Sequence, residues 1–247
     1  MKDIKKQITW MTLFCFLIAI IGCSSNAAFV YTPMSQFKST KKFPARVAVK
    51  AFLDQRGNNN KNYSLLALIP IVPFGIEEYN RPEAGSEFGA TQTSYQIRPP
   101  EDFSKALVTD LKASNMFEEV FYTERELPKD ADLVIEGTIN STDFRGEVIT
   151  YCLSFAAAYL WFFGLPVGHS SNEIVLSLRL ITAKDGNTVL ERSYNKQTSQ
   201  TGGLYYSNAS YCEGYARMVE DINRDFVTAI EGEFTNKPPE FWKSIKQ

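Results

Sequence analysis

Apolar residues in this chain are concentrated in three blocks, at 8–22, 64–76 and 148–168. The whole chain of 247 residues is 44% hydrophobic and 22% charged, which is typical of a globular protein and argues against long disorder or several membrane spans. Its length allows one large domain or two small ones, and either can bury a core. The three blocks therefore constrain the fold more than the average composition does.

The charge balance and the single histidine argue against several classes of function. Lys and Arg number 26 against 28 Asp and Glu, so the chain lacks the basic footprint of a nucleic-acid-binding protein. One histidine excludes most His-based metal sites, and a Ser-His-Asp site would depend on His169 alone. The chain has no Gly-x-Ser-x-Gly elbow, and its cysteines lack the paired spacing of metal ligands. We therefore expect no enzyme, no metal and no cofactor.

The first block belongs to an export signal. Three lysines precede an uncharged apolar stretch of about fourteen residues, 8–21, which is shorter than the ~20 residues of a membrane-spanning helix. It ends in the sequence Ile-Ile-Gly-Cys at 20–23, which resembles the bacterial lipobox. The resemblance implies cleavage between Gly22 and Cys23, removal of the signal peptide 1–22 and lipidation of the Cys23 thiol. The alternative is an uncleaved anchor with an incidental cysteine.

Lipidation of Cys23 would make the membrane a partner of this protein. Two or three acyl chains hold a protein stably at a bilayer, whereas one chain binds only marginally. Ser24 follows the cysteine, which favours the outer membrane over the inner one and leaves the domain facing the periplasm. Residues 23–44 are rich in polar residues and interrupted by prolines, so we expect a lipidated cysteine and a tether. Phe29 to Tyr31 is the one patch in this tether that is suited to docking.

Two cysteines remain in the mature chain, Cys152 and Cys212. An oxidising periplasm allows them to form a disulfide. The sequence does not give the Cα separation that a bridge requires, and buried free cysteines are common. The sequence is therefore compatible with either a disulfide between these cysteines or two free thiols.

The remaining segment, 45–247, has the pattern of a single periplasmic α/β domain. Alternating or β-branched patterns predict strands at 46–53, 117–123, 132–139, 173–183 and 188–197, and apolar stripes predict helices at 99–115 and 211–234. Gly137 interrupts its strand and is expected to mark a bulge. The order of elements favours an α+β sandwich, with a mixed sheet of about five strands, two main amphipathic helices and an extra apolar helical segment.

Three of these segments carry a resemblance to a known group of proteins. They are 47–56 (VAVKAFLDQR), 115–120 (NMFEEV) and 131–139 (ADLVIEGTI). They resemble the periplasmic domain of the curli-secretion lipoprotein, the TolB-type amino-terminal domain and related transport-auxiliary lipoproteins of the bacterial envelope. The resemblance implies a non-enzymatic protein that oligomerises or serves an export or envelope machine. It gives no role for the second and third apolar blocks, which depart from the pattern of the group.

The third block is the unusual feature of the mature chain. Residues 148–172 carry no formal charge when His169 is neutral, and this uncharged segment is long enough for a membrane span. Glycines and a proline break the last third of the block, and a span would separate the following hairpin and helix from their core partners. Three interpretations stay open: a membrane span, a helix that covers the core or the sheet, and a surface that touches a membrane or a partner.

Block 64–76 has the same apolar, Pro- and Gly-broken character, so we expect the two blocks to pack together. The residues expected to form an interface or an apolar-ligand surface are Leu68, Ile69, Ile71, Phe74, Trp161, Phe162, Phe163 and Leu165. Asp54 and Arg56 fit a stabilised turn better than an ion pair in a binding site.

Together these features predict a lipid-anchored, non-catalytic envelope protein. We expect an accessory or assembly component of an export or envelope complex, with a protein partner or a second copy of the chain. The alternative is a carrier for lipid or another apolar ligand, with Phe74 and residues 161–163 lining a cavity.

Overall fold

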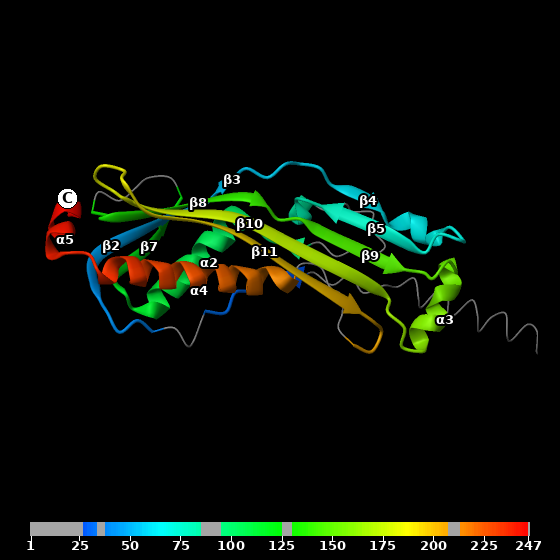
Figure 1. Ribbon diagram of the computed structural model, residues 1–247. Coiled ribbons are helices and arrows are strands. Elements are labelled where there is room, and N and C mark those ends of the chain that lie inside the picture. Colours follow the sequence, from blue (N-terminus) through cyan, green and yellow to red (C-terminus); the bar gives the residue numbers. More distant parts are fainter. Residues whose placement is uncertain (1–26, 34–37, 85–94, 125–129, 207–212, 247) are drawn as a thin grey trace, which may run out of the picture.

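The computed structural model describes residues 27–33, 38–84, 95–124, 130–206 and 213–246. Within these ranges the chain forms an elongated mixed sheet with its two long helices packed on one face (Figure 1). Gly22, Cys23 and Cys212 lie outside the described residues, so signal cleavage, lipidation and the disulfide stay predictions. Cys152 is exposed.

The described strands belong to two sheets. In chain order they are β1 Ala27–Ala28, β2 Phe43–Lys50, β3 Leu53–Asp54, β4 Lys61–Tyr63, β5 Phe74–Tyr79, β6 Tyr95–Gln96, β7 Phe117–Thr123, β8 Leu133–Ser141, β9 Phe144–Ile149, β10 Gly168–Thr182 and β11 Thr188–Gly202. The helices are α2 Pro99–Ser114, α3 Ala157–Phe162, α4 Glu213–Thr235 and α5 Pro239–Ile245, and short 3₁₀ helices are η1 Ser64–Leu68, η2 Pro82–Ala84 and η3 Ser154–Ala156.

The main sheet has nine strands, which corrects the expectation of about five. Its order is β4-β5-β9-β10-β8-β2-β7, with β11 also paired to β10 and β3 to β8. The strands β4, β5 and β9 were not predicted, because all three are short, and β5 and β9 each carry a glycine in place of a clean alternation. They form strands through pairing with one another and with β10.

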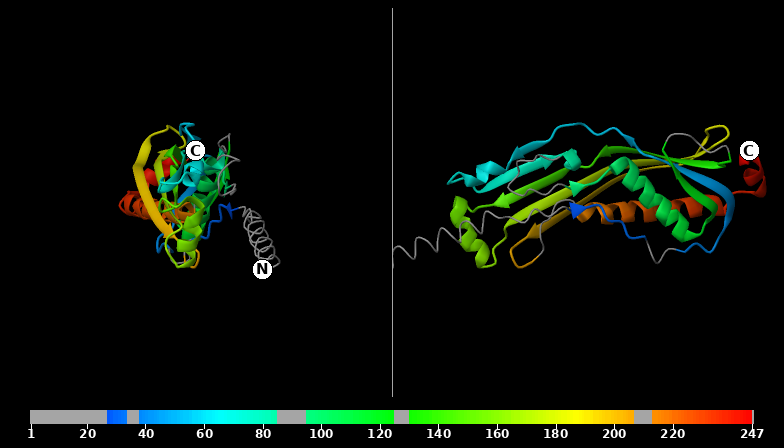
Figure 2. Two further views of the ribbon diagram at one scale, coloured as in Figure 1. Left: turned by 90° about the vertical axis from the view of Figure 1, so that its right-hand side faces the viewer. Right: turned by 180° about the vertical axis from the view of Figure 1, so that it is seen from behind.

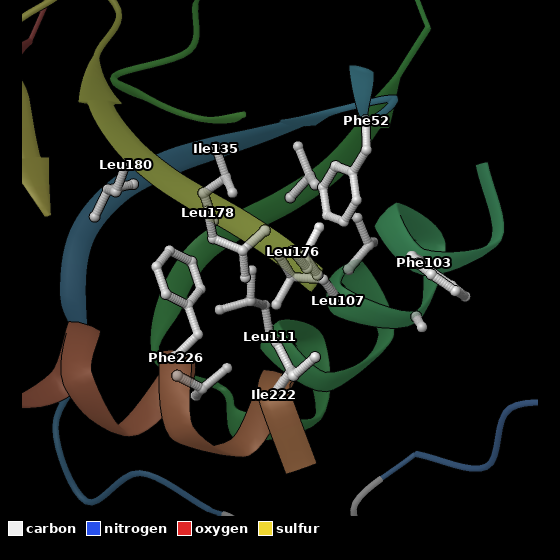
Figure 3. Close-up of a cluster of buried hydrophobic side chains, with 14 of the residues drawn as sticks. Phe52, Phe103, Leu107, Leu111, Ile135, Leu176, Leu178, Leu180, Ile222 and Phe226 are labelled. Carbon is white, nitrogen blue, oxygen red and sulfur yellow. The ribbon is translucent and has the colours of Figure 1, made fainter. Parts of the chain in front are cut away.

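The core lies between the sheet and the helices α2 and α4 (Figure 3). Leu107 and Leu111 from α2, Ile222 and Phe226 from α4, and Leu176 and Leu178 from β10 are fully buried. These side chains belong to the stripes that the helical and strand periodicities predicted. Each contributes about 1.5–3 kcal/mol through the apolar surface that it removes from water.

The hairpin of β10 and β11 sets the length of the molecule. Each strand has 15 residues, and they pair from Gly168 with Gly202 to Ile181 with Thr188. The segment 184–187 between the two predicted strands is a hairpin turn, with Gly186 in the left-handed conformation at φ 70°. Both strands continue past the end of α4 (Figure 1), and there they support the end of the molecule that carries α3.

Gly137 does not mark a bulge, which corrects the sequence prediction. It pairs directly with Leu178, and the register of β8 against β10 shifts instead between Ile139 and Ser141, so that Asn140 is the extra residue. A Cβ atom on Gly137 would lie 2.4 Å from a ring carbon of Phe52. The glycine is needed because the ring occupies the space of its side chain.

The patch at 29–31 docks onto the domain. The amide of Phe29 donates to the oxygen of Gln96 at 3.0 Å, and the ring of Phe29 lies 5.6 Å from that of Phe103. The hydroxyl of Tyr31 donates to the carboxylate of Asp110. Residues 29–31 are therefore in contact with the folded domain.

Candidate functional site

Three segments far apart in the sequence meet at the end of the molecule beyond α4. They are 64–76, 150–167 and 203–206, and we call them the apolar tip. The tip contains no Asp, Glu, Lys, Arg or His. It lies at the opposite end of the long axis from α5 (Figure 2).

The first two tip segments are joined by backbone hydrogen bonds, as expected for two blocks that pack together. The strands β5 and β9 pair from Phe74 with Ile149 onward. Beyond the end of the strands, the amide of Thr150 donates to Pro73 at 2.7 Å, and the amide of Ile71 donates to Cys152 at 3.1 Å.

Five polar side chains of the tip donate hydrogen bonds to the tip's own backbone or to the adjoining strand, whereas the hydroxyl of Ser64 is buried without a partner. The hydroxyl of Thr150 donates to Val72 (2.8 Å), that of Ser154 to Leu68 (2.7 Å), that of Tyr151 to Pro166 (2.8 Å) and that of Tyr205 to Phe162 (3.1 Å), and the indole Nε1 of Trp161 donates to Ile149 (2.9 Å). These bonds satisfy backbone carbonyls that a loop would otherwise leave to water. The surface of the tip is consequently formed mainly by apolar groups.

Exposed apolar side chains gather in the tip. Within the described ranges, fifteen of the eighteen large hydrophobic residues that are exposed belong to its three segments. Of the residues expected to form a surface, Leu68, Ile69, Ile71, Phe74, Phe162, Phe163 and Leu165 are exposed, and Trp161 is half-buried. Ile71 and Phe163 are each 83% exposed.

The sequence prediction missed part of this surface. Leu153, Phe155 and Tyr159 are also exposed, and so are Leu204, Tyr205 and Tyr206 after the end of β11. The exposure of Leu153, Phe155 and Tyr159 could have been predicted from the apolar character of the third block, to which they belong. No local signal connects 204–206 to the tip, because the long hairpin alone brings them there.

The third apolar block is not one helix. It forms the end of β9, a turn, the short helices η3 and α3, and the beginning of β10. Ala157 is the buried residue of α3, so this helix does not cover the core. Across the described parts of the chain, no helix combines the length and the apolar character needed to cross a bilayer.

The backbone of the tip is strained at several non-glycine residues. Ile71 (φ 75°), Tyr151 (φ 53°), Cys152 (φ 64°) and Ser154 (φ 51°) are in the left-handed region. A β-branched residue such as Ile71 is an outlier there. Strain of this kind persists only where the surrounding contacts impose it, and it clusters at functional sites.

A pocket of about 510 Å³ lies behind the tip, on the sheet. It is lined by Asn59, Glu78, Tyr79, Asn80, Asp143, Phe144, Arg145, Ser171, Asn172, Glu173, Gln197, Thr198 and Ser199. Most of these residues are polar or charged. None of the four residues expected to line an apolar cavity belongs to this pocket.

Asp54 and Arg56 form a closed structural cluster. The Arg56 guanidinium is buried and binds Asp54 at 3.0 Å, Glu83 at 2.5 Å and the hydroxyl of Thr142 at 2.7 Å. Its hydrogen bonds and charge hold the pKa of Asp54 below the ordinary value. These contacts fasten β3, η2 and the residues between β8 and β9 to one another, as expected for a stabilised turn.

His169 lies on β10, where its Nδ1 is 3.0 Å from the hydroxyl of Thr201. In the described ranges, no group of three or more His, Cys, Asp or Glu side chains is placed to hold a metal ion.

No family model matches this chain, and no curated protein matches its sequence significantly. Among solved structures, a DUF330-family protein of Xanthomonas campestris is similar with a TM-score of 0.42 and 10% identity, over 83% of this chain and 91% of that one. A homologue of the neuraminyllactose-binding hemagglutinin from Helicobacter pylori has a TM-score of 0.38 and 11% identity, over 90% and 98%. A lipoprotein of Neisseria meningitidis has a TM-score of 0.21 and 16% identity, over 78% and 100%. Likenesses this low assign neither a family nor a function.

Proposed function

We propose that this protein is a lipid-anchored, non-catalytic protein of the bacterial envelope, and that the apolar tip is its working surface. Its role is that of an accessory or assembly component of an export or envelope complex. The exposure of the tip is the observation that carries the proposal. The lipobox at Cys23 and the resemblance of 47–56 and 131–139 to envelope lipoproteins support the location.

The size of the exposed surface argues for a contact role. Seven large apolar side chains of the tip are more than half exposed: Leu65, Ile71, Phe155, Tyr159, Phe162, Phe163 and Tyr205. Since an aromatic side chain has about 150–250 Å² of surface, the five aromatic ones together expose about 500–900 Å². Monomeric proteins rarely expose apolar patches above a few hundred Å², and larger ones mark interaction sites.

The chemistry of the tip fits contact better than catalysis. Its side chains include no carboxylate, amine, guanidinium or imidazole group. General acid–base catalysis requires a group with a pKa near the working pH, held within hydrogen-bond reach of the substrate. Two of the tyrosines, Tyr151 and Tyr205, already donate to backbone carbonyls.

Two experiments test the proposal in the producing bacterium. Cys23→Ala should abolish labelling with radioactive palmitate and release the protein from the membrane fraction. In the second experiment, a photo-crosslinking amino acid replaces Phe163 in the tip or Lys184 at the exposed hairpin turn. We expect an adduct with an envelope component, lipid or protein, at position 163 and none at 184. Persistent palmitate labelling of Cys23→Ala, or the same adduct pattern at both positions, would contradict the proposal.

A further inference from the structure

We infer that the apolar tip inserts into the bilayer that holds the acyl chains of Cys23, so that the protein touches one membrane at two points. The inference rests on the proposed function, because it takes the lipidation of Cys23 as given. It adds the identity of the tip's partner, which is lipid.

The lack of charge in the tip favours lipid as this partner. Its three segments contain no Asp, Glu, Lys, Arg or His. A charged side chain is costly inside a bilayer, and its absence from all three segments removes that cost. On β5 and β9, charged residues lie behind the tip segments, where Arg145 binds Glu78 and Glu147.

The internal hydrogen bonds of the tip also favour lipid as its partner. Hydrocarbon offers no partners, so polar groups that enter it must be satisfied within the protein. Thr150, Ser154 and Trp161 all donate to carbonyls of the tip or of the adjoining strand β9. A protein partner would instead be recognised through about one hydrogen bond per 100–200 Å² of interface. The tip uses these three polar side chains for its own architecture.

The residue types fit the boundary between hydrocarbon and water. Ile71 and Phe163 are the most exposed apolar side chains of the tip and would enter deepest. Tyr159, Tyr205 and Tyr206 are exposed beside them. Tyrosine is enriched at the level of the lipid headgroups, because its ring is apolar and its hydroxyl is polar.

The length of the amino-terminal chain keeps the domain at the membrane. Three residues, 24–26, separate Cys23 from Ala27, the first residue of β1, and the four Cα–Cα steps from Cys23 to Ala27 span at most about 14 Å. In the right-hand view of Figure 2, β1 (dark blue) is level along the long axis with the end of α4 that is nearer to the tip. Phe29 and Tyr31 fix this segment to α2. The anchor therefore holds the tip side of the domain near the bilayer.

The anchor also makes insertion an intramolecular event. Once Cys23 is embedded, the tip experiences a high effective concentration of membrane, so even weak apolar insertion becomes favourable. Here the tip supplies apolar contact without a basic patch, so we expect binding to depend little on anionic lipid.

The two tryptophans of the mature chain make the inference measurable. Trp161 lies in the tip, whereas Trp242 lies in α5. The ring centroid of Trp242 is 5.4 Å from that of Phe43 and 5.0 Å from that of Phe234. Trp242→Phe leaves a reporter in the tip, and Trp161→Phe leaves one at the far end. Phe163→Trp, in a chain lacking both native tryptophans, gives a second tip reporter at a more exposed position.

The experiment uses the full mature lipoprotein, purified from membranes and reconstituted into vesicles of phosphatidylethanolamine and phosphatidylglycerol. Part of the phospholipid carries bromine on its acyl chains, which quenches tryptophan only on contact. We expect loss of emission from Trp161 and from the Phe163→Trp reporter, and no loss from Trp242. Phe162→Gln with Phe163→Gln should reduce the quenching of Trp161, whereas Leu53→Gln, at an exposed position outside the tip, should not. Circular dichroism checks that each variant is folded.

The other outcomes separate the inference from the proposed function. If the protein floats with the vesicles but neither tip reporter is quenched, insertion of the tip is wrong and the anchor at Cys23 stands. If the protein does not float, the proposed anchoring itself fails. Protection of the tip reporters from aqueous acrylamide that rises with protein concentration, without quenching by bromine, would overturn the inference in favour of contact with a second copy.

Discussion

The ring of Phe52 fills the space beside Gly137, where a Cβ atom would lie 2.4 Å from a ring carbon. Phe52 is buried, and its amide donates to the oxygen of Pro100 at 2.9 Å, at the beginning of α2. Gly137 lies in the middle of β8, within the sheet. This contact therefore joins the sheet to the first turn of the helix that covers it.

Gly137→Ala should lower the free energy of unfolding by about 1–3 kcal/mol, because the added methyl group overlaps the ring and forces it to move. Urea denaturation measures the change. Gly232→Ala is the matched control, since Gly232 lies in α4 and a Cβ atom there meets nothing within 4 Å. That substitution should stabilise the protein by about 0.5–1 kcal/mol. Equal effects at both positions would contradict the steric role of Gly137.

Ile71→Gly should leave the stability unchanged or raise it by up to about 1 kcal/mol, although it removes an apolar side chain. The left-handed conformation at φ 75° costs a non-glycine residue about 1–2 kcal/mol, whereas glycine adds about 0.5–1 kcal/mol of unfolded-state entropy. The control is Ile69→Gly, since Ile69 is extended at φ −86° and gains nothing from glycine. The midpoint of thermal unfolding should therefore be higher for Ile71→Gly than for Ile69→Gly, and the reverse order would show that the backbone at Ile71 is not strained.

Tyr31→Phe should loosen the amino-terminal segment by about 1 kcal/mol, because Tyr31 donates to Asp110 and accepts from Asn223 Nδ2 at 3.2 Å. Burial, together with the hydrogen bond to Asp110, raises the pKa of Tyr31 above its ordinary value of 10.0. The tyrosine thus contributes its full stability below about pH 10, and the contribution declines as the pH rises above that value.

Hydrogen exchange of residues 29–33 measures this loosening. Tyr63→Phe serves as the control because Tyr63 is exposed. Exchange that is unchanged in Tyr31→Phe, or equally faster in Tyr63→Phe, would argue against the docking contact.

Asp54→Asn should destabilise the protein by about 1–3 kcal/mol at neutral pH, because it weakens the pairing of a buried guanidinium. Hydrogen bonds from Arg56 and its charge lower the pKa of Asp54 from its ordinary value of 3.8. The stabilisation is therefore present above about pH 4 and is lost as the pH falls through the lower folded pKa. The difference between wild type and variant should shrink in that acidic range.

Urea denaturation between pH 7 and pH 2 measures this dependence. Asp221→Asn is the control, since Asp221 pairs with Arg224 on the exposed surface of α4 and contributes about 0–1 kcal/mol. A constant difference between wild type and Asp54→Asn over the whole range would contradict the lowered pKa.

The elements that sequence predicted well are those with a strong local period. The stripe of Phe103, Leu107 and Leu111 predicted a helix at 99–115, and α2 occupies Pro99–Ser114. The alternation from Ile174 to Leu180 predicted the strand β10, although the strand begins earlier, at Gly168. A face that is buried along a whole element imposes this period on the sequence.

The strands β4, β5 and β9 were not predicted because their sequences lack a strong local period. Gly75 is required in β5 because a Cβ atom there would lie 2.3 Å from the oxygen of Ser64, where η1 folds back. Gly146 likewise interrupts β9, which pairs with β5. These strands depend on each other as partners, and a local pattern contains no information about a partner about 70 residues away.

The sequence alone determined which residues build the core and which blocks carry a surplus of apolar residues without charge. It also contains, at 20–23, the motif that resembles a lipobox and from which the envelope location is proposed. The tertiary structure decided that the surplus is exposed, and that 64–76, 150–167 and 203–206 share one end of the molecule. The physical reason is that hydrophobicity is local to a residue, whereas exposure depends on which segments pair and where the covering helices end.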